Sequence, residues 1–150
     1  MYKKNNIHYL TKIFVDILFY AGIVCCIALP FVMPYLAKHF GYDDRVILPF
    51  NIILIIAGGC SLYILWQLKG IFKTLMDGSP FVLSNVDGLR KSAIASFVIV
   101  VDFAIKNIFW FSIMTTIITL IFALLGLFCL VLKDVFKQAI NFKEENDWTV

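Results

Sequence analysis

Charged residues are scarce in this chain of 150 residues: they make up 15% of it, whereas hydrophobic residues make up 61%. A soluble globular domain has about 25% charged residues and about 45–50% apolar residues. So few polar groups cannot cover the surface of a soluble fold of this size, and the mean hydropathy is high at +0.90. The scarcity of charge argues against a soluble enzyme, a disordered chain and a free nucleic-acid-binding domain. It predicts an integral membrane protein.

The sequence also lacks the motifs that carry catalysis or bind cofactors. It has no glycine-rich phosphate loop, no serine nucleophile elbow, no HExxH and no CxxC. The few cysteines all lie within apolar runs, which favours a packing role over a metal site or an extracellular disulfide. They are Cys25, Cys26, Cys60 and Cys129. We therefore predict that the protein is not an enzyme and uses no metal and no cofactor.

Apolar segments long enough to cross a membrane occupy most of the chain. A membrane-spanning helix needs about 20 mostly apolar residues, so this length suits one domain of four spans. We predict an all-α, polytopic membrane protein in which residues 1–150 form a single four-helix transmembrane domain. The predicted spans are residues 13–37, 46–68, 92–109 and 112–132, joined by a long loop at 69–91 and followed by a tail at 133–150.

Basic residues are unevenly distributed between the two sides of the predicted membrane domain. With four spans, the N-terminus, the long loop and the tail share one side, and ten of the 13 Lys and Arg residues lie there. The other side holds only Lys38, Arg45 and Lys106. Because Lys and Arg are enriched in cytoplasmic flanks, we predict a multi-pass membrane protein with both termini in the cytoplasm.

The long loop and the tail carry local patterns of their own. Residues 70–78 continue the helical pattern of the second span, and Gly70, Gly78 and Pro80 punctuate this part of the chain. We expect Ser84 to cap the helix that leads into the third span. After Leu132 the apolar residues recur every three or four positions, which predicts that the fourth helix extends into the cytoplasm as an amphipathic segment.

Ionisable residues inside the spans are candidate functional residues because they are costly in a membrane. Asp16 follows Lys12 by four residues, and Asp102 precedes Lys106 by the same spacing, so each acid has a potential partner one helical turn away. We favour structural pairs at both places. A proton or ion site stays an alternative, and the sequence leaves the depth of Asp102 and Lys106 in the membrane open.

Three pieces of sequence carry a resemblance to a known family: GSPF at residues 78–81, NVDGLR at 85–90 and FKEENDWTV at 142–150. They resemble a bacterial family of small four-span membrane proteins of unknown function. Its members show a PF…NV..LR stretch in the cytoplasmic loop and end in KxENDLTV or a close variant. Trp148 stands where the family usually has leucine. The resemblance extends over essentially the whole chain.

The resemblance implies a function as well as a fold. Members of the family are commonly encoded beside a small helix-turn-helix regulator similar to the Cro repressor. This implies a non-enzymatic, regulatory membrane protein that binds or sequesters that cytoplasmic transcription factor. The candidate partner-binding residues that it carries over are Pro80, Phe81, Asn85, Leu89 and Arg90 in the loop, and Glu144, Glu145, Asn146 and Asp147 in the tail.

Two other functions stay open from the sequence. A small ion- or proton-coupled transporter would use Asp16 or Asp102 as its coupling acid. A membrane stress or immunity protein would act on the bilayer or on another membrane protein. In every case the lipid bilayer is a partner and no direct contact with nucleic acid is expected. The sequence leaves open whether the chain forms a homo-oligomer.

Overall fold

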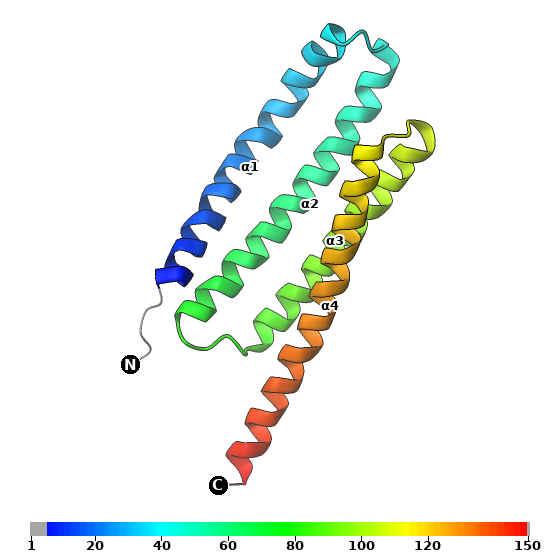
Figure 1. Ribbon diagram of the computed structural model, residues 1–150. Helices are drawn as coiled ribbons and strands as arrows, with labels where there is room; N and C mark the ends of the chain where they lie inside the picture. Colours follow the sequence, from blue (N-terminus) through cyan, green and yellow to red (C-terminus); the bar gives the residue numbers. More distant parts are fainter. Residues whose placement is uncertain (1–5, 150) are drawn as a thin grey trace.

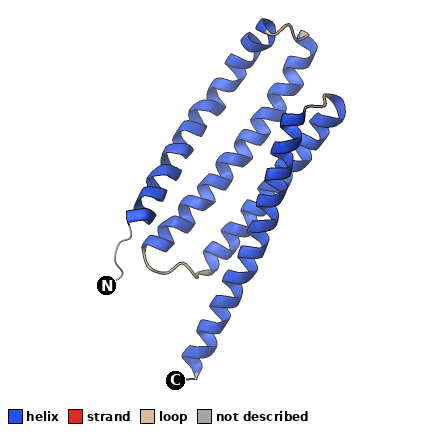
Figure 2. Ribbon diagram, in the orientation of Figure 1, coloured by secondary structure: helices blue, strands red, loops and turns tan. Residues whose placement is uncertain are grey.

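The computed structural model describes residues 6–149, and nearly all of them are helical (Figures 1 and 2). No strand occurs in this range. The helices are α1 (Asn6–His39), α2 (Asp44–Met76), α3 (Leu83–Phe109) and α4 (Ile113–Trp148). All four are long and apolar enough to cross a membrane. The shortest, α3, has 27 residues, which corresponds to about 40 Å at 1.5 Å per residue.

The helices are arranged as an open series and not as a closed bundle (Figure 1). The backbone of α1 packs against α2, α2 also packs against α3, and α3 also packs against α4. Within residues 6–149, no Cα atom of α1 lies within 8 Å of α3 or α4. The innermost positions in the series are therefore taken by α2 and α3, whereas α1 lies at one edge.

The core lies where α2, α3 and α4 meet. One cluster joins Ala57 and Ile64 of α2 to Ala95 and Ile99 of α3, and Phe122 of α4 packs against it. A second cluster lies nearer the α2–α3 loop and consists of Leu89, Ala93 and Cys129. Phe97 and Phe136 are among the residues packed around it. Small side chains on α3 allow its neighbours to approach closely, as is common between membrane helices.

Glycine brings α4 close to α3. A Cβ atom added at Gly126 would lie 3.0 Å from the ring of Phe97, which already fills the space above the glycine. The same device joins α1 to α2, because a Cβ at Gly58 would lie 2.7 Å from the sulfur of Cys26. Both interfaces thus depend on a glycine, which has no Cβ atom to keep the helices apart. Dispersion contacts of this kind are the main source of association between helices in lipid.

The observed elements confirm the predicted all-α, four-helix fold. The predicted spans 13–37, 46–68 and 92–109 lie inside α1, α2 and α3, and the span 112–132 starts one residue before α4. The turn between α3 and α4 lies at residues 110–112. The helical pattern after the second span is also real, since α2 continues to Met76. The single helix α4 continues past the ends of the other three helices, as the pattern after Leu132 indicated (Figure 1).

The predicted cap of α3 is wrong. Val82 occupies the N-cap position and makes no side-chain cap hydrogen bond, so Ser84 already lies inside the helix. The reason is local: the side chain of Asn85 reaches back to the carbonyl oxygen of Pro80 and organises the turn in place of a capping hydroxyl. Hydrogen bonds from the amides of Asn85 and Val86 to the carbonyl of Val82 complete the first turn.

Candidate functional site

Three of the five loop candidates have structural roles: Asn85 and Leu89 are buried, and Pro80 is half-buried and accepts a hydrogen bond from Asn85. Asn85 is only 3% exposed, and its side-chain amide donates hydrogen bonds to the hydroxyl of Thr74 and to the carbonyl of Pro80, both at 2.6 Å. Leu89 is buried in the second core cluster. Their side chains hold the loop against α2 and α3, so they are not accessible to a partner in this conformation.

Phe81 and Arg90 remain on the surface of the same region. Phe81 is 46% exposed, and the centroid of its ring lies 5.2 Å from that of Phe136 in an edge-on arrangement. This contact ties the loop to the extended part of α4. Arg90 is exposed and forms no ion pair with the residues at 6–149. The loop therefore presents one aromatic and one cationic side chain beside α4.

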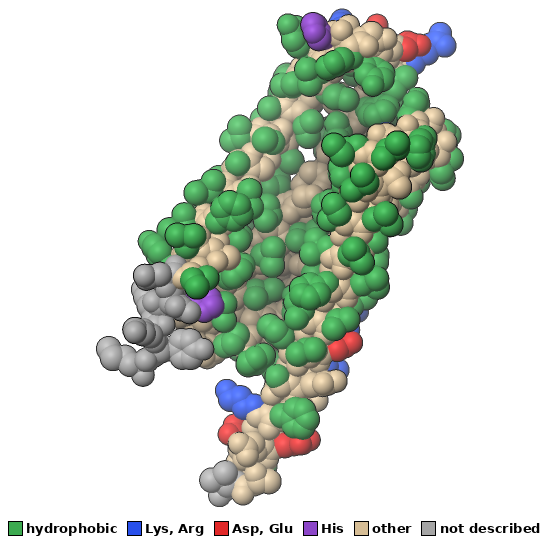
Figure 3. All heavy atoms as spheres, viewed as in Figure 1, with side chains coloured by type: hydrophobic (Ala, Val, Ile, Leu, Met, Phe, Trp, Pro, Cys, Tyr) green, Lys and Arg blue, Asp and Glu red, His purple; other side chains and the backbone are tan. Residues whose placement is uncertain are grey.

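The four tail candidates are all exposed. Glu144, Glu145, Asn146 and Asp147 lie on the last turns of α4, and the hydroxyl of Thr149 donates a hydrogen bond back to the carbonyl of Asn146. Figure 3 shows the charged side chains gathered on this protruding end, beyond a body covered by apolar side chains. The side chains named in this paragraph therefore face solvent around a helical end.

The charge of this helix end is opposite to the one that would stabilise the helix. The C-terminal end of a helix carries a partial negative charge, so cations are favoured there and carboxylates cost about 0.3–1 kcal/mol each. Nonetheless α4 has no basic residue in its last turn, while Glu145 and Asp147 lie there or next to it. Trp148 is 89% exposed at the same place. Neither feature stabilises the fold, and such local conflicts are typical of functional surfaces.

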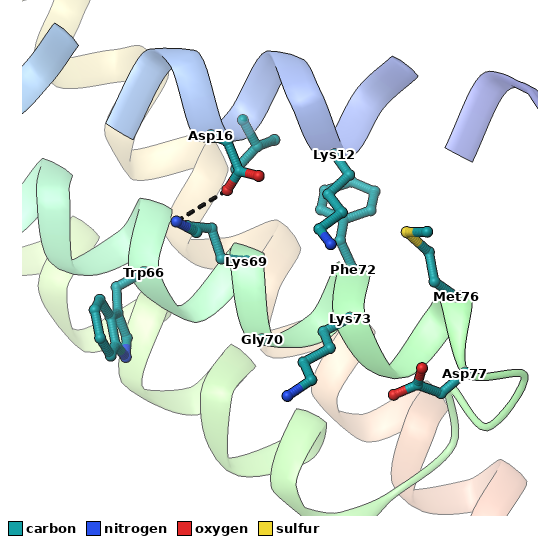
Figure 4. A pocket seen from close by; sticks show the side chains of 10 residues that line it. Lys12, Asp16, Trp66, Lys69, Gly70, Phe72, Lys73, Met76 and Asp77 are labelled. Carbon is teal, nitrogen blue, oxygen red and sulfur yellow. Dashed lines mark ion pairs between the residues drawn. The ribbon is translucent and has the colours of Figure 1, made fainter. Parts of the chain in front are cut away.

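Asp16 is paired, but its partner lies on another helix. Its carboxylate lies 2.9 Å from the ammonium of Lys69 on α2, and not against Lys12 as the spacing suggested (Figure 4). The ammonium of Lys69 also lies over the ring of Phe19, 4.7 Å from its centroid. Lys69 thus contacts the carboxylate of Asp16 and the ring of Phe19 together. Asp16 thus joins α1 to α2.

Asp102 and Lys106 do not pair with each other. The ammonium of Lys106 donates a hydrogen bond of 2.9 Å to the hydroxyl of Thr115 on α4, and it also lies over the ring of Phe50 on α2. The predicted pair within α3 is therefore not formed. One carboxylate oxygen of Asp102 is buried and has no hydrogen-bond partner among the residues that the structure describes.

The turn between α3 and α4 is held together by its own polar groups. The side-chain nitrogen of Asn107 donates a hydrogen bond to the hydroxyl of Thr116. The side-chain oxygen of Asn107 accepts a hydrogen bond from the backbone N–H of Ser112. Elsewhere, no three His, Cys, Asp or Glu side chains of residues 6–149 gather closely enough to hold a metal ion. Among the residues that the structure describes, the side-chain oxygen of Asn51 is, like that of Asp102, buried without a hydrogen-bond partner. The exposed carboxylates at the end of α4 and the ionisable Asp102 are the features that call for a functional explanation.

Four long apolar helices and a protruding charged end define the protein as a multi-pass, all-α membrane protein. The chain belongs to the DUF2975 family, described as a protein of unknown function, whose model matches residues 35–150. This confirms the resemblance to a family of small four-span membrane proteins, although the match starts near the end of α1 and not at the first span. No curated protein and no solved structure matches the chain.

Proposed function

We propose that this protein is a non-enzymatic regulator of the bacterial cell membrane that binds or sequesters a cytoplasmic helix-turn-helix transcription factor. The observation that carries the proposal is the end of α4. This helix continues past the apolar body and presents Glu144, Glu145 and Asp147 to solvent, where the helix itself gains nothing from them.

The chemistry of the tail suits a DNA-binding partner. Such proteins carry Lys and Arg on the surface that contacts phosphate, and those side chains are free to meet carboxylates when DNA is absent. Complementary charge speeds association and selects among partners. An exposed aromatic residue such as Trp148 adds the contact area that anchors an interface. A regulator bound here would be kept from its DNA by occupation of the same basic surface.

The proposed orientation places this surface in the cytoplasm. The start of α1, the α2–α3 loop and the end of α4 lie toward one end of the molecule (Figure 1). Most of the Lys and Arg residues flank the apolar helices at this end, as expected for the cytoplasmic side. The regulator would therefore meet Phe81, Arg90 and the tail without crossing the membrane.

A variant with a neutral tail tests the proposal. The triple variant Glu144→Gln, Glu145→Gln, Asp147→Asn removes the charge and keeps the shape of the side chains. A matched control, Asp43→Asn with Asp44→Asn, neutralises two carboxylates at the opposite end. We expect the unaltered protein and the control to co-purify a helix-turn-helix protein from detergent-solubilised membranes, and the triple variant to recover at least 10-fold less of it. Equal recovery by all three proteins would refute the proposal.

A second candidate function rests on the buried oxygen of Asp102. An acid without a hydrogen-bond partner on a membrane-spanning helix is suited to take up a proton or an ion, so an ion-coupled carrier is the alternative. Asp16 is less suited because Lys69 occupies its carboxylate. Ion or proton flux into proteoliposomes that depends on the unaltered protein and stops with Asp102→Asn would favour the carrier over the regulator.

A further inference from the structure

A groove separates α1 from α2 near the start of α1 and the end of α2 (Figure 4). Its volume is about 440 Å³. Lys12 lines it from α1, and Trp66, Lys69, Phe72 and Lys73 line it from α2. Lys12 and Lys69 each lie at the border between a basic flank and a long apolar run, at residues 13–37 and 46–68 respectively. The groove is therefore placed at the depth where lipid headgroups meet acyl chains.

The walls of the groove combine positive charge with apolar surface. Three ammonium groups face two carboxylates, Asp16 and Asp77, so the surplus is positive. Asp16 pairs with Lys69, whereas Lys12 and Lys73 have no ion-pair partner within residues 6–149. Basic pockets between membrane helices on the cytoplasmic side are typical sites for anionic headgroups.

Gly70 opens the groove, and nothing in the packing of the helix requires a glycine there. A Cβ atom added at Gly70 would meet no atom within 4 Å, whereas at Gly58 of the same helix it would lie 2.7 Å from the sulfur of Cys26. Glycine is among the least favourable residues inside a helix. Gly58 is explained by the close approach of α1, but Gly70 leaves empty space between Lys69 and Lys73 in the wall of the groove (Figure 4).

We propose that this groove is a binding site for an anionic phospholipid. The lipid phosphate is held by Lys12 and Lys73 above the gap at Gly70, and its acyl chains lie along the apolar surface near Trp66 and Phe72. The cations select an anionic over a zwitterionic lipid, and the apolar walls select a lipid over a free phosphate. The site joins α1 to α2, so a bound lipid stabilises the edge of the helix series. The inference is independent of any transcription factor.

Lipid binding is to be measured on the purified full-length protein in nanodiscs of phosphatidylcholine that contain increasing amounts of phosphatidylglycerol. The number of phosphatidylglycerol molecules retained per protein is read by native mass spectrometry after transfer to detergent. We expect one phosphatidylglycerol to be retained at least 10-fold more strongly than phosphatidylcholine. Equal retention of the two lipids, or displacement of phosphatidylglycerol by millimolar inorganic phosphate, would overturn the proposal.

Two pairs of variants locate the site. Gly70→Leu fills the groove, and its matched control Gly59→Leu places the same side chain at another position of α2 that meets no atom within 4 Å. Lys12→Gln with Lys73→Gln removes the free cations, and Lys133→Gln with Lys137→Gln is the control on α4. We expect Gly70→Leu, and the variant with Lys12→Gln and Lys73→Gln, each to retain phosphatidylglycerol at least 5-fold less strongly. The two controls should retain it as the unaltered protein does.

The lysine pair keeps the test decisive where Gly70→Leu lowers the yield of folded protein, because Lys12 is half-buried and Lys73 exposed, and glutamine is a good helix former at both positions. Unchanged retention by the variant with Lys12→Gln and Lys73→Gln would contradict the proposal, as would an equal loss in its control on α4.

Discussion

α1 and α3 are both apolar helices long enough to span a membrane, but they are packed in opposite ways. α3 lies between α2 and α4, and Ala93, Ser96 and Ile99 are fully buried there. α1 contacts α2 alone, and large apolar side chains such as Phe31, 77% exposed, cover its free face. The apolar side chains of the two helices therefore have different roles. On α3 they form the core, and on α1 they face lipid.

The difference bears on function because α4 packs against α3. The tail that carries the exposed carboxylates is the continuation of the helix whose Cys129 and Gly126 lie in the best packed part of the molecule. The tail therefore extends from a helix that packs closely against α3. α1 is held by the close contact at Gly58 and by the ion pair of Asp16 with Lys69, so it is the helix most open to the influence of lipid.

Truncating an isoleucine on each helix tests the contrast most strongly. Ile99→Ala on α3 leaves a cavity among the residues of the first core cluster, and we expect it to lower the free energy of unfolding by about 2–5 kcal/mol. Ile27→Ala on α1 changes a side chain that is 64% exposed to lipid or detergent, and we expect a change within about 0.5 kcal/mol. Denaturation of the purified protein in mixed micelles measures both. Similar losses for the two variants would break the contrast.

The hydrogen bond between α3 and α4 at Lys106 gives the next largest effect. Thr115→Val leaves the buried ammonium without its hydroxyl partner, which costs about 1–3 kcal/mol. Thr119→Val is the matched control, because the hydroxyl of Thr119 only donates back to the carbonyl of Thr115 in its own helix. Thermal unfolding followed by circular dichroism should show a clear loss for the first variant alone; an equal loss for both would mean that Lys106 does not depend on Thr115.

Asn85 tests whether the loop is a structural or a docking element. Asn85→Ala removes two hydrogen bonds of 2.6 Å that fix the turn between α2 and α3, and we expect a loss of stability of about 1–2 kcal/mol. Asn141→Ala, at an exposed position on the extended part of α4, serves as the control. Recovery of the proposed regulator by co-purification should be the same for both variants. A loss of recovery with Asn85→Ala at unchanged stability would restore this residue as a partner-binding residue.

The smallest expected effect concerns the ion pair that joins α1 to α2. Asp16→Asn, Lys69→Met and the double variant form a double-mutant cycle that isolates their interaction. The two side chains are 32% and 27% exposed, so water screens the pair, and we expect a coupling free energy of at most about 1 kcal/mol. A coupling as large as the loss for Ile99→Ala would show that α1 is held as firmly as α3.

Much of the fold was predictable because its signals are local. The high hydropathy of residues 13–37 and the periodicity after Leu132 can each be seen within a short stretch of chain. The first stretch forms part of α1, and the second forms the extension of α4. The pairing of Asp16 with Lys69 was not predictable in the same way. It depends on which turns of α1 and α2 face each other, and the spacing of Lys12 offered a nearer but unused partner.

The candidate site was predictable only in part. The tail candidates are exposed, which suits their composition, since unpaired charged side chains are costly to bury. Asn85 and Leu89 were candidates on the strength of a resemblance, and the structure places both inside the fold. Their hydrogen bonds and contacts involve Thr74 and Cys129, on helices whose relative positions are set by tertiary packing and not by any short pattern.

The measurement that tests the central claim most directly is site-specific photo-cross-linking in living cells. A photoreactive amino acid replaces Trp148 at the end of α4 in one protein and Phe111 in the turn at the opposite end in another. If the end of α4 is the docking surface, cross-links from position 148 contain a helix-turn-helix DNA-binding protein and those from position 111 do not. Cross-links from position 148 that contain no DNA-binding protein would contradict this claim, as would recovery of the same regulator from both ends.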